Sequence, residues 1–235
     1  MKSALYVVPN LLGAVPPREV LPQRTIDIAR DITHWVVETP KAARAFLKTL
    51  EPKHAIASMQ IDAISDATDA RALERVLDPI RGGFAVGLLS DAGCPGVADP
   101  GAALIACAHA RAISVVPLVG PSSLLLALMA AGMNGQRFAF HGYLPVKPQE
   151  RANALRGLEV SSRVEQCTQI FIETPYRNAP MLATIVATLA PATRVCVAVD
   201  LTLPTESVRT LAVRDWRRVD GAVYDKRPAI FLIES

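Results

Sequence analysis

The sequence predicts an α/β protein with two lobes, a mostly parallel sheet in the N-terminal half and a mixed sheet in the C-terminal half. Short apolar runs alternate with helical patterns along the chain, which is typical of βαβ units. Hydrophobic residues make up 51% of the chain and aromatic residues only 5%, so the core must consist mainly of Ala, Val, Leu and Ile. After Phe138 the strands become denser and the helices fewer. We therefore expect one lobe over residues 1–118 and a second over 119–235.

The N-terminal half alternates strand and helix in the regular way that predicts a parallel sheet. The expected strands are Ala4–Val8, His34–Val37, Ala55–Met59, Phe84–Leu89 and Ile113–Val116. The expected helices are Gln23–Asp31, Lys41–Leu50, Asp69–Arg81 and Ala102–Ala110. The segment Ala14–Pro22 contains three prolines, and we expect it to be a stiff, exposed loop.

The C-terminal half has the pattern of a mixed α/β lobe. The expected strands are Phe138–His141, Gln169–Ile172, Arg194–Val199, Ser207–Ala212 and Ala229–Ile233, and the expected helices are Ser123–Ala131, Glu150–Glu159, Arg177–Leu189 and Val213–Arg218. Residues 112–136 carry no charge, but Pro and Gly interrupt them repeatedly. We therefore expect a strand, a loop and a buried helix there, and no membrane segment.

The most informative stretch is LLSDAGCPGVADPG, residues 88–101. It joins the end of a buried strand to the start of a helix through small residues, so a ligand could approach the bare backbone and the helix N-terminus. Asp91 lies just past the strand end, where open α/β sheets hold their sites. It is either the polar contact of that ligand or the cap of a turn.

Four other loops share this style, since each follows an expected strand and is rich in Gly, Pro, Ser or Thr. They are residues 9–13 (PNLLG), 117–123 (PLVGPSS), 173–177 (ETPYR) and 200–206 (DLTLPTE). One such loop is weak support for a site, because most strand ends need turn residues. Several loops on one edge of a sheet favour a binding site.

Composition argues against several classes of function. The net charge of +3 is mild, and a strongly basic footprint of the kind that nucleic-acid binders show is absent. The four cysteines lack the spacing of a zinc site or a disulfide framework, so we expect no metal and reduced thiols in a cytoplasmic protein with no signal peptide. No GxGxxG follows the first strand, which argues against a nicotinamide-dependent oxidoreductase.

The motifs SDAGCPGVADPG, VVPLVGPSS, AAGM and FAFHGYLPVK resemble those of the tetrapyrrole methylase family. Within this family they are most similar to the branch that methylates a ribose 2′-hydroxyl of small-subunit ribosomal RNA. The resemblance covers nearly the whole chain and is most specific over residues 84–147. It implies a two-lobed methyltransferase that works as a homodimer and holds S-adenosylmethionine in a cleft between the lobes.

The resemblance also implies which residues contact the methyl donor. By position they are Pro9, Leu11, Asp91, Gly93, Pro95, Ser122, Ser123, Tyr176, Ala198 and Ala229. A neutral, backbone-rich pocket suits an adenine ring, and a carboxylate suits ribose hydroxyls or an ammonium group. Ser122 and Ser123 could instead be N-caps of the helix that follows them.

The sequence departs from the ribosomal RNA branch on the expected acceptor side. The branch reads TPIGNL in the first loop, where this chain has NLLGAV at residues 10–15. The branch carries Glu-Asp-Thr-Arg after the second strand, where this chain has Glu38-Thr39-Pro40-Lys41. It also carries a small helical extension beyond the position of Ser235. The donor side is therefore better retained than the acceptor side.

A ribose hydroxyl is a poor nucleophile and needs a base, for which Glu38 and Glu173 are our candidates because each directly follows a strand. Asp99 and Glu206 are weaker candidates, since Asp99 precedes Pro100 as a helix N-cap would. Glutamates such as Glu173 and Glu206 are more often solvated or ion-paired than catalytic. His141 and Cys94 are interpreted as structural. Arg177, Lys147 and Arg151 could contact RNA phosphates or simply face solvent.

Two other functions stay open. The first is a methyltransferase with a small-molecule acceptor such as a tetrapyrrole, which the low positive charge favours. The second is a homologue that binds the donor without catalysing transfer, which the altered first loop and Thr39-Pro40-Lys41 leave open.

Overall fold

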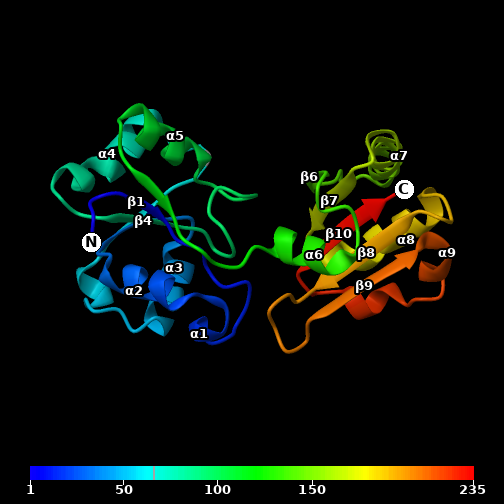
Figure 1. Ribbon diagram of the computed structural model, residues 1–235, viewed down its shortest axis with the longest axis horizontal. Coiled ribbons are helices and arrows are strands. Elements are labelled where there is room, and N and C mark those ends of the chain that lie inside the picture. The colour runs from blue at the N-terminus through cyan, green and yellow to red at the C-terminus, as the bar shows by residue number, and fades with distance from the viewer. Residues whose placement is uncertain (66) are drawn as a thin grey trace. The chain divides into compact units, whose positions relative to one another are not determined.

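The computed structural model describes residues 1–65 and 67–235, and the chain divides into two compact units, Met1–Ser122 and Ser123–Ser235. Each unit contains one five-stranded sheet covered by helices (Figure 1). The N-terminal sheet is parallel and the C-terminal sheet is mixed, which confirms the predicted fold class. No helix in the described part of the chain is both long and apolar enough to span a membrane.

The parallel sheet of the N-terminal unit has the strand order β3-β2-β4-β1-β5. In Figure 1, α2 and α3 lie on one side of this sheet and α4 and α5 on the other, and each side has its own apolar core. The elements of this unit are β1 Leu5–Val7, α1 Pro17–Val20, α2 Gln23–Asp31, β2 His34–Val37, α3 Pro40–Thr49, the 3₁₀ helix η1 Ile56–Ser58, β3 Gln60–Ala63, α4 Ala70–Arg81, β4 Val86–Leu89, α5 Ala102–Ala110 and β5 Val115–Pro117.

The central position of β4 and β1 explains their composition. β4 is buried at every residue, because helices cover both faces of a parallel sheet. Gly87 in β4 leaves room for the ring of Trp35, since a Cβ at this glycine would lie 2.6 Å from ring carbons of the tryptophan. The apolar runs that predicted these strands therefore supply side chains to the hydrophobic cores on both faces of the sheet.

The C-terminal sheet has the order β6-β7-β10-β8-β9, with only the β6–β7 pair parallel. One face packs on α7, α8 and α9 around the stacked rings of Phe171 and Phe231. The elements are α6 Ser123–Ala131, β6 Phe138–Tyr143, α7 Pro148–Glu165, β7 Thr168–Glu173, the 3₁₀ helix η2 Pro175–Arg177, α8 Asn178–Thr188, β8 Arg194–Val199, β9 Ser207–Ala212, α9 Val213–Trp216, the 3₁₀ helix η3 Gly221–Tyr224 and β10 Ala229–Glu234.

Three expectations about elements were wrong. The strand expected at Ala55–Met59 is the helical turn η1, and the strand of this region is β3, a half-exposed edge strand without an apolar run. The segment Ala14–Pro22 contains the helical turn α1, which begins at Pro17 because proline suits the first helical position. α7 extends to Glu165, well past the expected end at Glu159, because a helix on a surface continues through polar residues.

Candidate functional site

Three loops of the N-terminal unit meet at one edge of the parallel sheet. Loop 1 (residues 9–13) follows β1, loop 2 (residues 90–101) follows β4, and loop 3 (residues 118–122) follows β5. Because β1 lies between β4 and β5 in a parallel sheet, the carboxyl ends of all three strands lie at this edge. The predicted convergence of the first three loops is therefore a property of this unit by itself.

Direct contacts join the three loops. The amide of Asn10 in loop 1 donates to the carbonyl of Gly93 in loop 2 at 2.8 Å. The thiol of Cys94 in loop 2 donates to the carbonyl of Pro121 in loop 3 at 3.4 Å. Loops 1 and 3 touch so closely that a Cβ at Gly120 would lie 2.4 Å from the Cβ of Pro9. At the carboxyl edge of the parallel sheet, the three loops thus pack directly against one another.

Asn10 contributes more of these contacts than any residue that we predicted. Its side chain is buried, and its Nδ2 donates to the carbonyls of Ser90 at 2.9 Å and Asp91 at 3.0 Å. Its Oδ1 accepts from the amide of Leu11 at 2.7 Å. Asn10 is not among the residues predicted from the sequence. The signal that could have identified it is an asparagine directly after a buried strand, since a carboxamide can serve both the donors and the acceptors of turn backbone.

Asp91 and Glu38, predicted for different roles, lie next to each other. The amide of Asp91 donates to Oε2 of Glu38 at 3.1 Å, and Oδ2 of Asp91 accepts from the hydroxyl of Thr39 at 2.7 Å. Asp91 is exposed and Glu38 is half-buried. Thr39, which replaces the acidic residue of the ribosomal RNA branch, therefore orients Asp91. This contact was also missed from the sequence.

Asp99 is the third carboxyl group of the cluster. Burial first, and then the charges of Glu38 and Asp91, raise the pKa of Asp99 to about 6, although the nearby Ser90 hydroxyl opposes the rise. The expected N-cap role of Asp99 is wrong, because the N-cap residue of α5 is Gly101 with φ +136°. A glycine is needed there since other residues rarely adopt this backbone conformation. Asp99 is therefore available for electrostatic interaction with a ligand.

The remaining predicted donor contacts of the N-terminal unit lie in the same three loops. Pro9, Gly93 and Pro95 are buried, and Leu11 and Ser122 are half-buried. Gly93 has φ +65°, which favours glycine. Burial raises the pKa of the Cys94 thiol, in agreement with its interpretation as a structural loop residue.

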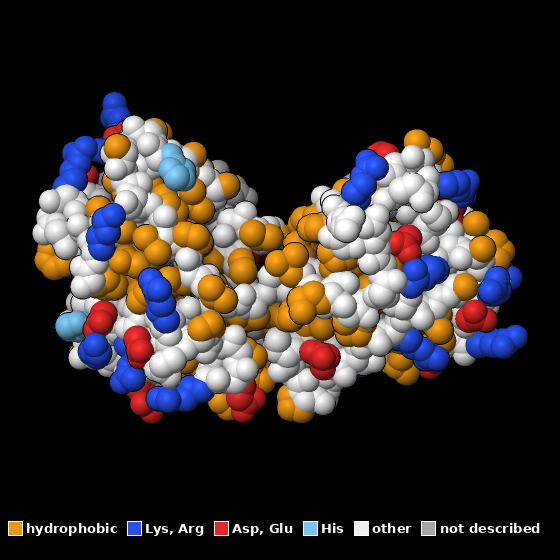
Figure 2. Space-filling model, in the orientation of Figure 1, with side chains coloured by type: hydrophobic (Ala, Val, Ile, Leu, Met, Phe, Trp, Pro, Cys, Tyr) orange, Lys and Arg blue, Asp and Glu red, His pale blue; other side chains and the backbone are white. Residues whose placement is uncertain are grey.

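Hydrophobic side chains also reach the surface of this unit (Figure 2). An open apolar groove runs between loop 2, α5 and β5, with Pro95, Gly96, Ile105 and Val115 among the residues that line it. Pro95 is the predicted site residue in this lining. The groove adjoins the side of loop 2 that faces α5.

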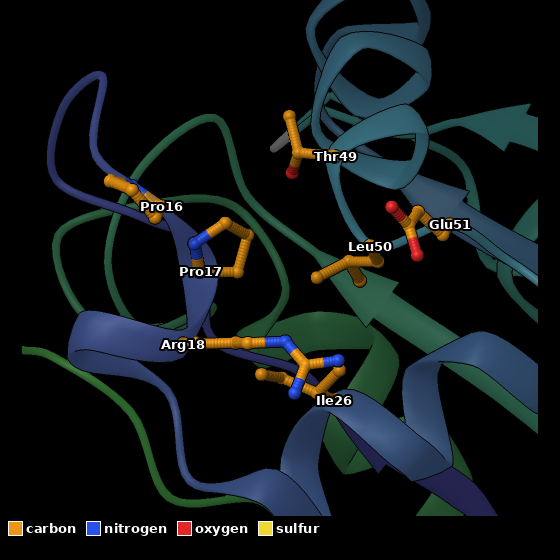
Figure 3. A pocket seen from close by; sticks show the side chains of 7 residues that line it. All are labelled: Pro16, Pro17, Arg18, Ile26, Thr49, Leu50 and Glu51. Carbon is orange, nitrogen blue, oxygen red and sulfur yellow. The ribbon is translucent and has the colours of Figure 1, made fainter.

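A separate pocket of the N-terminal unit lies where α1, α2 and the end of α3 meet (Figure 3). The side chains of Arg18, Ile26 and Leu50 line it, together with Glu51 just after α3. None of the predicted site residues lines this pocket. Among the described residues, no group of three or more His, Cys, Asp or Glu side chains is arranged to hold a metal ion.

The predicted residues of the C-terminal unit lie around the ends of β7 and β8 and the start of β10. Ala198 in β8 is fully buried, and Ala229 at the start of β10 pairs with Glu173 on one side and Val199 on the other. Tyr176 is 77% exposed. Ser123 is the first residue of α6. The side chains of Tyr176 and Ala198 thus have very different access to solvent.

Glu173 is held in an ion pair. Its side chain is 1% exposed, and Oε1 receives Arg177 Nη2 at 2.5 Å and the amide of Thr174 at 2.6 Å. Oε2 is also buried, and no hydrogen-bond partner lies within reach of it among the described residues. The ion-paired role expected of Glu173 therefore accounts for Oε1, whereas Oε2 remains able to accept a hydrogen bond from a further partner.

The other charged candidates are engaged in structural contacts. Glu206 Oε2 accepts from the amide of Thr202 at 2.7 Å. Arg151 is buried and donates to the hydroxyl of Thr184 at 3.1 Å, so it does not offer a surface for phosphate. Lys147 is exposed and pairs with Glu150 at 3.0 Å. His141 bonds Gln169 at 2.6 Å, as expected of a structural histidine.

Comparison with solved structures identifies the fold. The methyltransferase CobJ has a TM-score of 0.64 at 18% identity, with 99% of this chain and 94% of that chain covered. Cobalt precorrin-4 methyltransferase CbiF has a TM-score of 0.60 at 13% identity, with 99% and 95% covered. At these identities the likeness shows the fold alone, which is that of the tetrapyrrole methylases.

Comparison with curated sequences identifies the family, although no family model matches the chain. Ribosomal RNA small subunit methyltransferase I of Vibrio cholerae serotype O1 is 28% identical over 211 residues, which are 90% of this chain and 69% of that protein. The enzyme of the same name from Escherichia coli O157:H7 is 31% identical over 207 residues, which are 88% of this chain and 68% of that protein. Similarity of this extent shows that the chain belongs to the ribosomal RNA small subunit methyltransferase I family.

Proposed function

We propose that this protein transfers a methyl group from S-adenosylmethionine to a ribose 2′-hydroxyl of small-subunit ribosomal RNA. The observation that carries the proposal is the junction of loops 1, 2 and 3 at the carboxyl edge of the parallel sheet, in a chain of this methyltransferase family. The relatives' name supports the RNA acceptor, and the resemblance of the motifs supports the ribose hydroxyl.

The loops of the N-terminal unit fit this donor. S-adenosylmethionine carries a sulfonium and an ammonium group, and Asp91, Glu38 and Asp99 supply carboxyl groups within one small region. The left-handed turn at Gly93 leaves backbone uncovered by side chains, as the flat adenine and ribose rings require. Pro9, Leu11, Asp91, Gly93, Pro95 and Ser122 are the residues of this unit that would hold the donor.

Four further donor contacts remain predictions in the C-terminal unit. They are Ser123, Tyr176, Ala198 and Ala229, for which the family resemblance implies a contact with the donor. Exposed Tyr176 offers an aromatic face to the adenine. Ala198 is fully buried, and its small side chain leaves space for a group that packs against β8.

When bound, S-adenosylmethionine would supply an activated methyl group: the C–S bond would break as the C–O bond forms, and its electron pair would remain on the sulfur. The chain must orient the acceptor hydroxyl and take its proton. Glu38 is half-buried and, within the described part of the chain, receives one hydrogen bond, from the amide of Asp91. Glu173 is already engaged by Arg177 in an ion pair and by the amide of Thr174. Of our two candidates, Glu38 is therefore better placed to accept a proton.

Calorimetric titration tests the donor half of the proposal. S-adenosylmethionine and S-adenosylhomocysteine are titrated into the folded protein, and micromolar dissociation constants are expected. Failure of both ligands to bind would remove the methyltransferase assignment. The homologue without catalysis is distinguished by a second assay, because it would bind the donor and transfer nothing.

Transfer of a radiolabelled methyl group tests the acceptor half. Small ribosomal subunits from cells that lack the modification are the expected acceptor, with label in the ribose of the RNA. A tetrapyrrole is the competing acceptor, because the similar solved folds include CbiF, named for cobalt precorrin-4. Label on a tetrapyrrole and none on RNA would replace the proposed acceptor by this one.

We also propose that the protein forms a homodimer, on the basis of the family resemblance. Sedimentation equilibrium of the full chain is expected to give twice the monomer mass of 25.2 kDa. A monomer at every concentration tested would contradict this part of the proposal without affecting the donor site.

A further inference from the structure

Asn10 has contacts that a residue of an ordinary turn does not need. Its amide, Nδ2 and Oδ1 together make four hydrogen bonds of 2.7 to 3.0 Å, to Gly93, Ser90, Asp91 and Leu11. Three of these bonds cross from loop 1 to loop 2, over 80 or more positions of sequence. Asn10 is 5% exposed, so water cannot easily replace these partners.

The bonds of Asn10 fix the part of loop 2 that carries Asp91. Nδ2 donates to the carbonyl of Ser90, which belongs to the peptide group before Asp91, and to the carbonyl of Asp91, which belongs to the peptide group after it. That same amide of Asp91 donates to Glu38, and its side chain accepts from Thr39. The peptide groups on both sides of Asp91 are thus clamped between Asn10 and Glu38.

We propose that Asn10 is a positioning residue for the methyl donor: its buried carboxamide locks loop 1 onto loop 2 and so sets the position of Asp91. This proposal rests on the proposed function, because it assigns the loops to S-adenosylmethionine. It assigns a new role within the altered first loop, at a position where the ribosomal RNA branch has threonine in place of asparagine. The altered sequence of loop 1 is therefore compatible with a donor site, because Asn10 connects this loop to loop 2 by hydrogen bonds.

The variant Asn10→Asp is the sharpest test. It is nearly isosteric, but it places a carboxylate oxygen where Nδ2 now faces two carbonyl oxygens, so both bonds are replaced by repulsion. Asn10→Ser is the conservative partner, because its hydroxyl can still accept from the amide of Leu11. Asn134→Asp is the matched control: Asn134 likewise donates through Nδ2 to a carbonyl, that of Gln166, and accepts an amide, that of Gln136, but in the C-terminal unit.

The full-length parent and the three variants are titrated with S-adenosylmethionine and unfolded thermally. We expect Asn10→Asp to weaken donor binding by roughly tenfold or more, Asn10→Ser to weaken it less, and Asn134→Asp to keep it within about twofold at a comparable loss of thermal stability. A difference in affinity between two variants of equal stability cannot come from a general loss of stability.

Two results would overturn the inference. If folded Asn10→Asp and Asn10→Ser bind the donor as the parent does, Asn10 does not position it, while the proposed function stands. If Asn134→Asp weakens binding as much as Asn10→Asp, the effect belongs to stability in general. Failure of the folded parent to bind the donor would instead overturn the proposed function, and the role of Asn10 with it.

Discussion

Asp91 and Asp99 lie eight residues apart in loop 2 and have different surroundings. Asp91 is exposed and oriented by Thr39, whereas Asp99 is half-buried beside two other carboxylates. A cationic ligand would lower the free energy of this cluster by offsetting the repulsion among its members.

At the scale of single residues, the first prediction concerns Asp91→Asn. Removing its charge while keeping its shape should weaken S-adenosylmethionine binding by roughly tenfold or more, since a charge-assisted contact is replaced by a neutral one. Calorimetry measures the dissociation constant. Asp78→Asn on the exposed face of α4 is the control and should bind as the parent does. Equal affinity of Asp91→Asn and parent would show that Asp91 only shapes its turn.

The second concerns the pH dependence of stability at Asp99. Its pKa is raised from 3.8 to about 6, so the folded state binds this proton more tightly than the unfolded chain does. Ionisation of Asp99 therefore lowers stability as the pH rises from about 4 to about 6, and the penalty is complete above that range. Asp99→Asn should raise the melting temperature at pH 7.5, with a smaller gain at pH 4.5. A gain of the same size at both pH values would contradict the raised pKa.

At the scale of elements, the site depends on how closely loops 1 and 3 approach each other. Gly120 has no side chain because Pro9 occupies the space, and Cβ at Gly120 would also lie 3.0 Å from Cδ2 of Leu21. Strands β1 and β5, which precede the two loops, pair directly, and their last residues Val7 and Pro117 are partners. This pairing fixes the distance between the loops. The loops therefore have little freedom to move apart.

Gly120→Ala tests this close approach. The new methyl group must displace Pro9, so we expect a loss of about 1–3 kcal/mol in the free energy of unfolding and weaker donor binding. Urea denaturation and calorimetry measure the two effects. Gly135→Ala is the matched control, because no atom lies within 4 Å of a Cβ built there. Parent-like stability and affinity of Gly120→Ala would mean that loop 1 adapts freely.

At the scale of the whole molecule, each unit has a core of its own. The C-terminal core surrounds Phe171 and Phe231, and the N-terminal cores lie on the two faces of the parallel sheet. A ligand stabilises the part of a protein to which it binds, by an amount set by its concentration relative to the dissociation constant. Because their cores are separate, the two units should respond separately to core substitutions and to a ligand.

Differential scanning calorimetry checks this expectation. Leu47→Ala in the N-terminal unit and Phe171→Leu in the C-terminal unit should each lower a different transition, because each removes packing from one core. S-adenosylmethionine at 100 times its dissociation constant should stabilise the transition of the N-terminal unit by roughly 2.7 kcal/mol. A donor that raises only the transition sensitive to Phe171→Leu would place the site away from loops 1 to 3.

Several elements could be predicted to the residue from sequence. β2, β8 and β9, and likewise α2, α5 and α6, have the bounds that their patterns indicate. The buried runs of β8 and the apolar faces of the helices are required by packing, so the pattern and the structure have the same cause. β3 could not be found in this way, because an edge strand exposed on one side needs no apolar run.

The candidate site was predictable in its loops and only partly in its residues. The loop 90–101 was evident from its glycines and prolines, and Asp91 from its place after β4. The pairing of Asp91 with Glu38 and Thr39 joins segments more than 50 positions apart, and no local pattern encodes such a contact. The same is true of Asn10, whose importance lies in carbonyls of a distant loop.

Periodicity and short motifs are local properties of the chain, so the α/β class, the parallel and mixed sheets and the resemblance to a methyltransferase family could all be inferred from the order of residues. Which side chains meet depends on the folded arrangement. It placed Asn10 as the connection between loops 1 and 2, assigned the cap of α5 to Gly101 in place of Asp99, and enclosed Glu173 with Arg177. These contacts arise only when strands that are distant in sequence pair in one sheet and bring their ends to the same edge.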